Sequence, residues 1–244
     1  SAVLAGTGAG TATNASDSSA NYAGGWTNGS NGGFGFGGWA LSHDANAGHF
    51  ATNSGWGLWS HEGTNLSEAV RTLSPALSTG QTFRVRMQNG WIWEKGGSVG
   101  VALRDSEDSV LWQLYFNGGY TNYHTATGST DIAWTDAGID IAFTVTETNS
   151  YSVEVQPVGG SVRQYTGTFS GPIAQFRAWS YNNGTSDTNN FHRDFFINNL
   201  GVTSMAGGGE STSAATVHVV RESGGDSPPL IAGMELQGGG NRLG

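Results

Sequence analysis

Three carboxylates, Asp105, Glu107 and Asp108, stand close enough in the sequence to share a ligand. Carboxylate oxygens are the ligands that Ca²⁺ prefers in proteins. These residues fall, however, between apolar alternating segments at 99–103 and 110–116, in a predicted turn where acidic side chains ordinarily cap the backbone and face water. We therefore predict no obligatory cofactor and no other metal, and we keep the three residues as a weak Ca²⁺ candidate.

Two glycine-rich segments match known functional motifs by letter. Residues 33–38 fit GxGxxG, and residues 96–100 fit GxSxG. A nucleotide site or a nucleophile elbow needs a helix directly after these glycines. The segments that follow alternate as strands do, so we predict no catalytic residue. An enzyme, either a glycoside hydrolase or a polysaccharide lyase, is the third and least favoured hypothesis.

Polar and aromatic side chains alternate with apolar ones along several segments. In the clearest, Phe83, Val85 and Met87 would face a core and their neighbours would face solvent. Sugars bind to mixtures of aromatic rings and hydrogen-bonding groups. The predicted glycan-binding residues are Arg84, Arg86, Gln88, Gln113, Tyr115, Arg177 and Trp179. The alternative is that the tryptophans are packing residues, which is the more common role of tryptophan.

These side chains would be held by strands. Glycine supplies 40 of the 244 residues, roughly twice its usual share, and charged residues only 12%. Residues 139–145 and 151–155 alternate in the same way and predict a hairpin. Short apolar segments separated by Gly, Asn, Ser and Asp turns are typical of all-β proteins. The sequence predicts an antiparallel β-sandwich of the jelly-roll, concanavalin A-like type, with no convincing helix.

The ends of the chain differ from its middle. We predict an N-terminal arm over 1–19, the sandwich over 20–202, and a C-terminal arm over 203–244 with strand-like segments. An arm that adds a strand to the open sheet edge of another copy would build a head-to-tail filament. The residues predicted to enter the neighbouring sheet are Val3, Leu4, Val217, Val219, Leu230, Ile231, Met234 and Leu236.

Charge and cysteine content limit the partners and the compartment. The formal charge of −9 argues against nucleic acid as a partner. The chain contains no cysteine, which excludes disulfides and thiolate metal sites, and it has no apolar segment long enough to span a membrane. It begins at Ser1 with small residues, as a chain does after a signal peptide is removed. We therefore expect an exported, extracellular or cell-surface protein.

Three segments carry a resemblance to a known class. They are Asn21–Trp39, with its GGFGFGG core, then Gly55–Trp59, and Asp194–Leu200. Together they resemble an uncharacterised secreted Gly/Asn-rich β-sandwich domain of bacterial surface proteins, in the broad concanavalin A-like or laminin G-like class. The likeness spans roughly residues 20–201. It implies fold and export but no established activity.

Two functional hypotheses follow from these observations. The first is a non-catalytic extracellular subunit that assembles with itself into a filament or surface layer by exchanging strands. The alternative is a lectin-like carbohydrate-binding module with an aromatic and polar sheet face, whose partner would be a polysaccharide.

Overall fold

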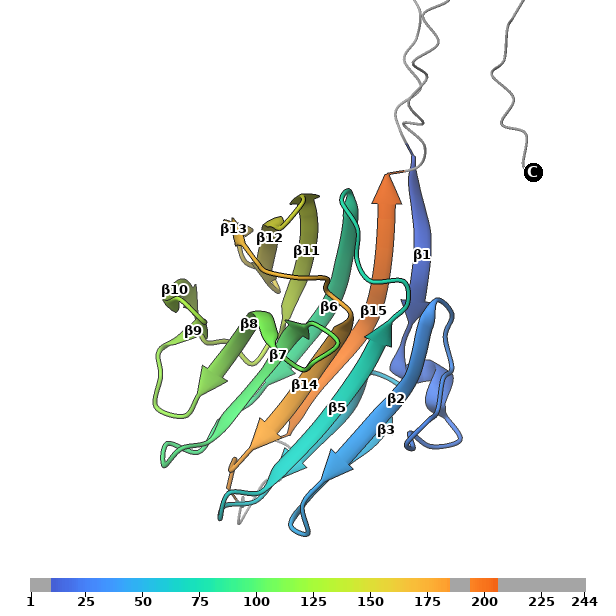
Figure 1. Cartoon of the computed structure of the whole chain (residues 1–244). Coiled ribbons are helices and arrows are strands. Elements are labelled where there is room, and N and C mark those ends of the chain that lie inside the picture. Colours follow the sequence, from blue (N-terminus) through green and yellow to red (C-terminus); the bar gives the residue numbers. More distant parts are fainter. Residues whose placement is uncertain (1–9, 185–193, 206–244) are drawn as a thin grey trace, which may run out of the picture. The chain divides into compact units, whose positions relative to one another are not determined.

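The computed structural model describes residues 10–184 and 194–205. These residues form two antiparallel sheets packed face to face (Figure 1). We call them sheet A, with strand order β13-β12-β11-β6-β15-β4-β3 and β1 added beside β15, and sheet B, with strand order β10-β9-β8-β7-β14-β5-β2. The predicted all-β antiparallel sandwich is confirmed.

The strands have the following bounds. Sheet A contains β1 (Thr11–Asp17), β3 (Ala47–Thr52), β4 (Gly55–Ser60), β6 (Gln81–Asn89), β11 (Ile139–Glu147), β12 (Ser150–Pro157), β13 (Arg163–Thr168) and β15 (Phe195–Met205). Sheet B contains β2 (Phe36–His43), β5 (Leu66–Leu73), β7 (Ser98–Arg104), β8 (Val110–Asn117), β9 (Asn122–Thr125), β10 (Gly128–Ala133) and β14 (Gln175–Tyr181). The 3-10 turn η1 (Ser19–Tyr22) follows β1.

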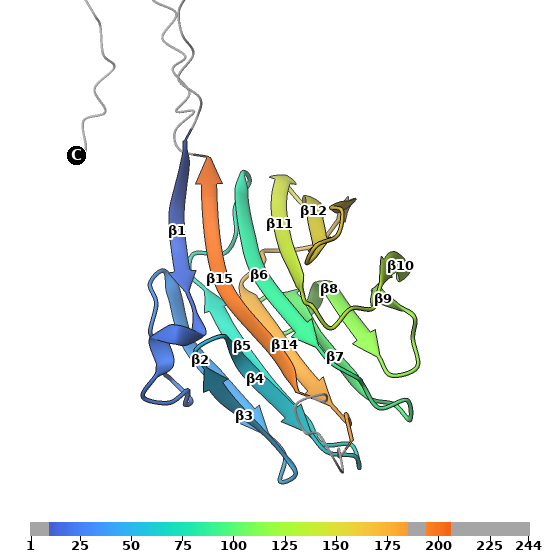
Figure 2. The ribbon, with the colours of Figure 1, turned by 180° about the vertical axis from the view of Figure 1, so that it is seen from behind.

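Alternation decides which side chains enter the core between the sheets. On β6, Phe83, Val85 and Met87 are at most 3% exposed, while Arg84 points to solvent. The predicted hairpin is β11–β12, paired so that Ile141 lies opposite Val155. Strand β11 pairs on its other side with β6, and β6 pairs with β15, so these strands lie side by side in sheet A (Figure 2). Residues that the sequence separates by more than 100 positions thus share one sheet face.

Strand β1 lies inside the range predicted as an N-terminal arm. It pairs with β15 from Thr11, opposite Met205, to Asp17, opposite Leu200. Its composition is small and polar, but backbone hydrogen bonds to β15 suffice to form a strand, and Ala15 and Asp17 turn inward. Strand β15 in turn extends to Met205, beyond the predicted boundary at residue 202.

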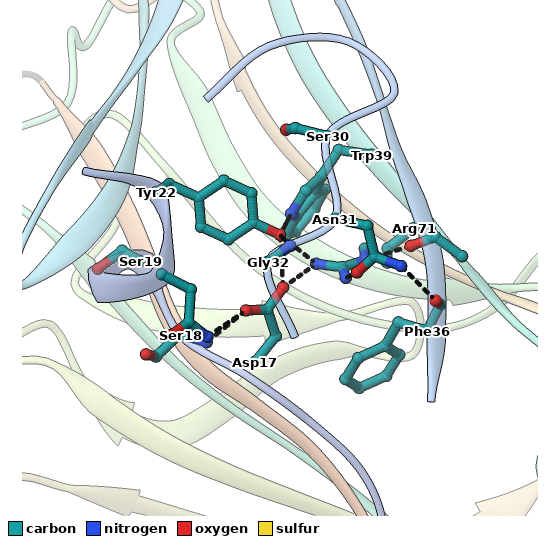
Figure 3. A network of polar contacts seen from close by, with 12 residues as sticks. Asp17, Ser18, Ser19, Tyr22, Ser30, Asn31, Gly32, Phe36, Trp39 and Arg71 are labelled. Atoms are coloured by element: carbon teal, nitrogen blue, oxygen red, sulfur yellow. Dashed lines mark hydrogen bonds and ion pairs between the residues drawn. The ribbon is translucent and has the colours of Figure 1, made fainter. Parts of the chain in front are cut away.

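A buried ionic cluster connects the two sheets (Figure 3). The guanidinium of Arg71 on β5 contacts the Asp17 carboxylate of β1 at 2.5 Å, and both side chains are completely buried. Arg71 also donates to the Gly37 carbonyl and to Asn31, while the Tyr22 hydroxyl donates to Asp17 at 2.5 Å. Because no part of the Asp17–Arg71 pair reaches solvent, we interpret the cluster as a structural clamp between the sheets.

Candidate functional site

The solvent face of sheet A contains a groove of about 340 Å³. Strands β6, β11 and β12 form its floor, and the turn before β13 and a bend in β15 contribute at its margins. Its lining includes the side chains of Arg84, Arg86, Asp140, Ala142, Glu154, Gln156, Val162 and Asn199.

Strand register arranges these side chains in two rows across the sheet. Ala142 on β11 lies opposite both Arg84 and Glu154, and Asp140 lies opposite both Arg86 and Gln156. Ala142 is small, so the sheet surface is hollow at its position, while the longer side chains of Arg84 and Glu154 project from the strands on either side. The hollow therefore follows from one small residue between two long ones.

The two arginines of the groove differ in their partners. Arg86 donates to both carboxylate oxygens of Asp140, from Nε at 2.8 Å and from Nη2 at 2.7 Å. The hydrogen bonds to Asp140 raise the pKa of the Arg86 guanidinium. The side chains of Arg84 and Glu154 have no hydrogen bond or ion pair with any residue that the structure describes, and both residues are exposed. These two charged groups are therefore available to a ligand.

A bulge in β15 adds Asn199 to the groove. The register of β15 against β6 shifts between Asn198 and Gly201, and Asn199 has a positive φ of 57°. Asparagine tolerates this left-handed conformation better than most residues, and such bulges often re-aim a side chain beside a functional site. Asn198 is fixed by hydrogen bonds with the Ser19 amide and the Ser54 carbonyl, which leaves Asn199 exposed at the groove.

The seven predicted glycan-binding residues do not form one site. Arg84 and Arg86 line the groove, and Gln88 lies on the same strand face but donates to the Asp136 carbonyl instead. The other four, Gln113, Tyr115, Arg177 and Trp179, lie on β8 and β14 of sheet B. Because the outer faces of the two sheets point in opposite directions, these four cannot bind the same stretch of ligand as Arg84.

The predicted stacking residue Trp179 is covered. It packs over Gly100, donates from Nε1 to Ser98, and carries the Arg177 guanidinium 4.7 Å from its ring centroid. Only 7% of it is exposed. Arg177 is itself bound by Glu68, and burial lowers the pKa of its guanidinium. On this face of sheet B, Glu68 pairs with both Arg104 and Arg177, and the ring of Trp179 is covered.

The acidic turn is arranged around its own backbone. Asp105 accepts hydrogen bonds from the amides of Glu107 and Ser109, which lower the pKa of its carboxyl, with the Ser109 bond the main cause. Asp108 faces Arg104 at 3.5 Å. Within residues 10–184 and 194–205, no three His, Asp or Glu side chains are grouped to hold a metal ion. The structure thus does not bring the predicted Ca²⁺ ligands together.

The residues predicted for strand exchange, Val3 and Leu4 together with Val217, Val219, Leu230, Ile231, Met234 and Leu236, lie outside the described residues. None of the described helical segments is long and apolar enough to cross a membrane. Three residues at the groove, Glu154, Gln156 and Asn199, were not among the predicted glycan-binding residues. The first two alternate with buried valines on β12, which is the same signal that identified Arg84.

No family model matches the chain, and no curated protein matches its sequence. Among solved structures, the chain is similar to part of a sialidase, with a TM-score of 0.50 and 12% identity over 68% of this chain and 17% of the sialidase chain. It thus spans under a fifth of that protein. At this identity the likeness shows the fold alone.

Two further solved structures are more distant. An alginate lyase from Corynebacterium sp. has a TM-score of 0.41 and 15% identity over 66% of this chain and 79% of the lyase. The Ca²⁺/Man3GlcNAc-bound exoplasmic/lumenal domain of VIP36 has a TM-score of 0.44 and 10% identity over 69% of this chain and 84% of that domain. The broad sandwich class inferred from the sequence is confirmed, whereas membership of a secreted surface-protein family stays a prediction.

Proposed function

We propose that the protein is a non-catalytic, lectin-like carbohydrate-binding module and that the groove on sheet A is its glycan site. The observation that carries this proposal is the set of planar hydrogen-bonding side chains around the hollow, two of which, Arg84 and Glu154, have no partner among the described residues. Sugar hydroxyls both donate and accept hydrogen bonds. A concave site with a few convergent polar groups suits them.

The charges of the groove suggest how a saccharide would lie in it. Arg84 and Glu154 flank Ala142, so one sugar unit above Ala142 could accept hydrogen bonds from the guanidinium and donate to the carboxylate. The Arg86–Asp140 pair is bidentate and fixed, which supports a preformed site that loses little side-chain freedom on binding. Val162 at the margin adds apolar surface for the ring carbons.

The lining also supports binding without catalysis. The described lining residues include no histidine or tyrosine to remove a proton from a sugar carbon, and Asp140 is held in its ion pair with Arg86. A glycosidase would need a pair of carboxyl groups, and Asp140 and Glu154 on neighbouring strands are the pair that the groove contains. Assays for released oligosaccharides test this directly, because activity lost in Glu154→Gln would overturn the non-catalytic part of the proposal.

A glycan array followed by titration calorimetry on the best ligand tests binding. We expect Arg84→Ala and Glu154→Gln each to weaken binding about tenfold, or about 1.4 kcal/mol. Arg163→Gln is the matched control, since it removes a similarly exposed arginine that pairs with Asp131 at the β13 edge. Unchanged affinity in both groove variants, or an equal loss in the control, would refute the assignment.

Self-assembly through the arms and export to the cell surface stay sequence-based proposals. Light scattering of the full chain beside a chain ending at Met205 tests the first. Filaments or large oligomers that disappear on truncation would support strand exchange, and monomers in both samples would exclude it.

A further inference from the structure

A second hollow, of about 190 Å³, lies at one end of the sandwich among three loops. The loops are residues 90–97 between β6 and β7, 118–121 between β8 and β9, and 134–138 between β10 and β11. Its lining consists of Trp91, Ile92, Glu94, Phe116, Tyr120 and Trp134 beside the backbone of Gly119. It shares no lining residue with the groove on sheet A.

Exposed aromatic rings gather at this hollow. Trp91, Tyr120 and Trp134 are 42%, 42% and 40% exposed. They are three of the eight large apolar side chains that are exposed among the described residues. Single exposed apolar residues need no explanation, but several around one concavity mark a binding site. The buried side chains of Ile92 and Phe116 complete the lining of the hollow.

The loops hold these rings in place. The Trp134 amide donates to the Thr121 carbonyl at 2.9 Å, which ties two of the loops together. The Trp134 ring lies 6.4 Å from Phe116, and the Tyr120 ring lies 4.2 Å from His124. Gly118 allows the first two loops to touch, since an added Cβ would lie 2.0 Å from the Trp93 carbonyl. The hollow is therefore preformed, and binding would not require its rings to be ordered first.

One carboxylate sets the polarity of the hollow. Glu94 is the only charged side chain among the described lining residues. Gly119 leaves space beside it, because a Cβ there would meet nothing nearer than the Glu94 side chain at 3.8 Å. The neighbouring cation, Lys95, lies 5.9 Å from the Trp93 ring centroid. A ligand here would thus meet apolar ring faces and a hydrogen-bond acceptor that repels anions.

We propose that this hollow, which we call the aromatic pocket, binds one neutral pyranose unit. The apolar C–H face of such a sugar would stack on an indole ring, and its hydroxyls would donate to Glu94. The volume is below the roughly 300 Å³ that a drug-sized ligand needs, which matches a single ring. A membrane surface is disfavoured because Glu94 would enter the lipid with the rings. This inference shares its ligand class with the proposed function but none of its residues, so each can fail without the other.

Nuclear magnetic resonance of the full chain tests the proposal with methyl glucoside, methyl galactoside and methyl mannoside as probes. We expect at least one to shift the indole N–H signals of Trp91 and Trp134. Trp134→Ala and Tyr120→Ala should each weaken that binding tenfold or more. Phe34→Ala removes an aromatic side chain that is even more exposed, at 55%, but does not line the pocket, so this change should leave the binding unchanged. Arg84→Ala should also leave it unchanged, which separates this pocket from the groove.

The charge of Glu94 makes the pocket selective against anionic sugars, and this selectivity can be tested separately. The methyl glycoside of the matching uronic acid should bind several-fold more weakly than the neutral sugar, and Glu94→Gln should narrow that difference. The proposal is overturned if none of the neutral glycosides moves either indole signal at millimolar concentration. It is also overturned if Phe34→Ala weakens binding as much as Trp134→Ala does, or if the rings bind phosphatidylcholine vesicles and no sugar.

Discussion

Replacing Arg71 by methionine tests the interpretation of the buried cluster as a clamp between the sheets. The variant leaves the Asp17 carboxylate completely buried without its cation and removes the hydrogen bonds to Asn31 and the Gly37 carbonyl. Breaking a buried ion pair in this way costs about 3–5 kcal/mol. A domain of this size has a free energy of unfolding of about 5–15 kcal/mol, so Arg71→Met should remove at least about a fifth of it. The expected fall in Tm is roughly 6–20 °C.

Urea denaturation followed by tryptophan fluorescence measures this loss. Arg163→Met is the control, because the Arg163–Asp131 pair is 43% and 63% exposed and such pairs contribute about 0–1 kcal/mol. The double variant Arg71→Met with Asp17→Asn should be less destabilised than the sum of the single changes, since the second change removes the unpaired charge. A loss in Arg71→Met no larger than in the control, or strict additivity in the double variant, would refute the clamp.

Two further predictions concern single positions. Burial raises the pKa of Asp194 from 3.8 to about 6, so the folded state binds a proton more tightly than the unfolded state and stability should fall as pH rises from about 4 to 6. Asp194→Asn should remove that slope in urea titrations and stabilise the protein at pH 7 by at most about 3 kcal/mol, and a slope that persists would contradict the assignment. An added Cβ at Gly100 would lie 2.6 Å from the side chains of Trp179 and Tyr115, so Gly100→Ala should cost about 1–3 kcal/mol of unfolding free energy. Gly24→Ala is the control, because an added Cβ there meets no atom within 4 Å and neither Gly24 nor Gly100 has a positive φ. An equal loss in both variants would show that crowding is not the cause.

Local alternation explains what the sequence could predict. It placed Arg84 and Arg86 on the solvent face of a strand, and both line the groove. It could not say which sheet each strand joins, because β6 pairs with β11 and β15, about 55 and 115 positions away in the chain. The four candidates on β8 and β14 were therefore grouped with residues that lie on the opposite side of the sandwich.

Features that depend on a bend or on several loops escaped prediction for the same reason. Asn199 reaches the groove through a bulge, and the local signal in the sequence is the short run Asn198-Asn199-Leu200-Gly201. The aromatic pocket combines Trp91, Tyr120 and Trp134 from three loops that no local pattern relates. Strand β1 is recognisable only from its partner, since its own side chains are small and polar.

The pairing of β1 with β15 also determines how the domain would respond to a pulling force. Thr11 lies opposite Met205, so both ends of the described domain leave from the same end of sheet A (Figure 1). A load applied between them would peel β1 away and break its hydrogen bonds one after another, which needs less force than shearing them all together. Peeling would stop at Asp17, where the ion pair with Arg71 joins the strand to sheet B. A single-molecule extension trace should thus show β1 released at low force, with a short gain in length, before the main unfolding event.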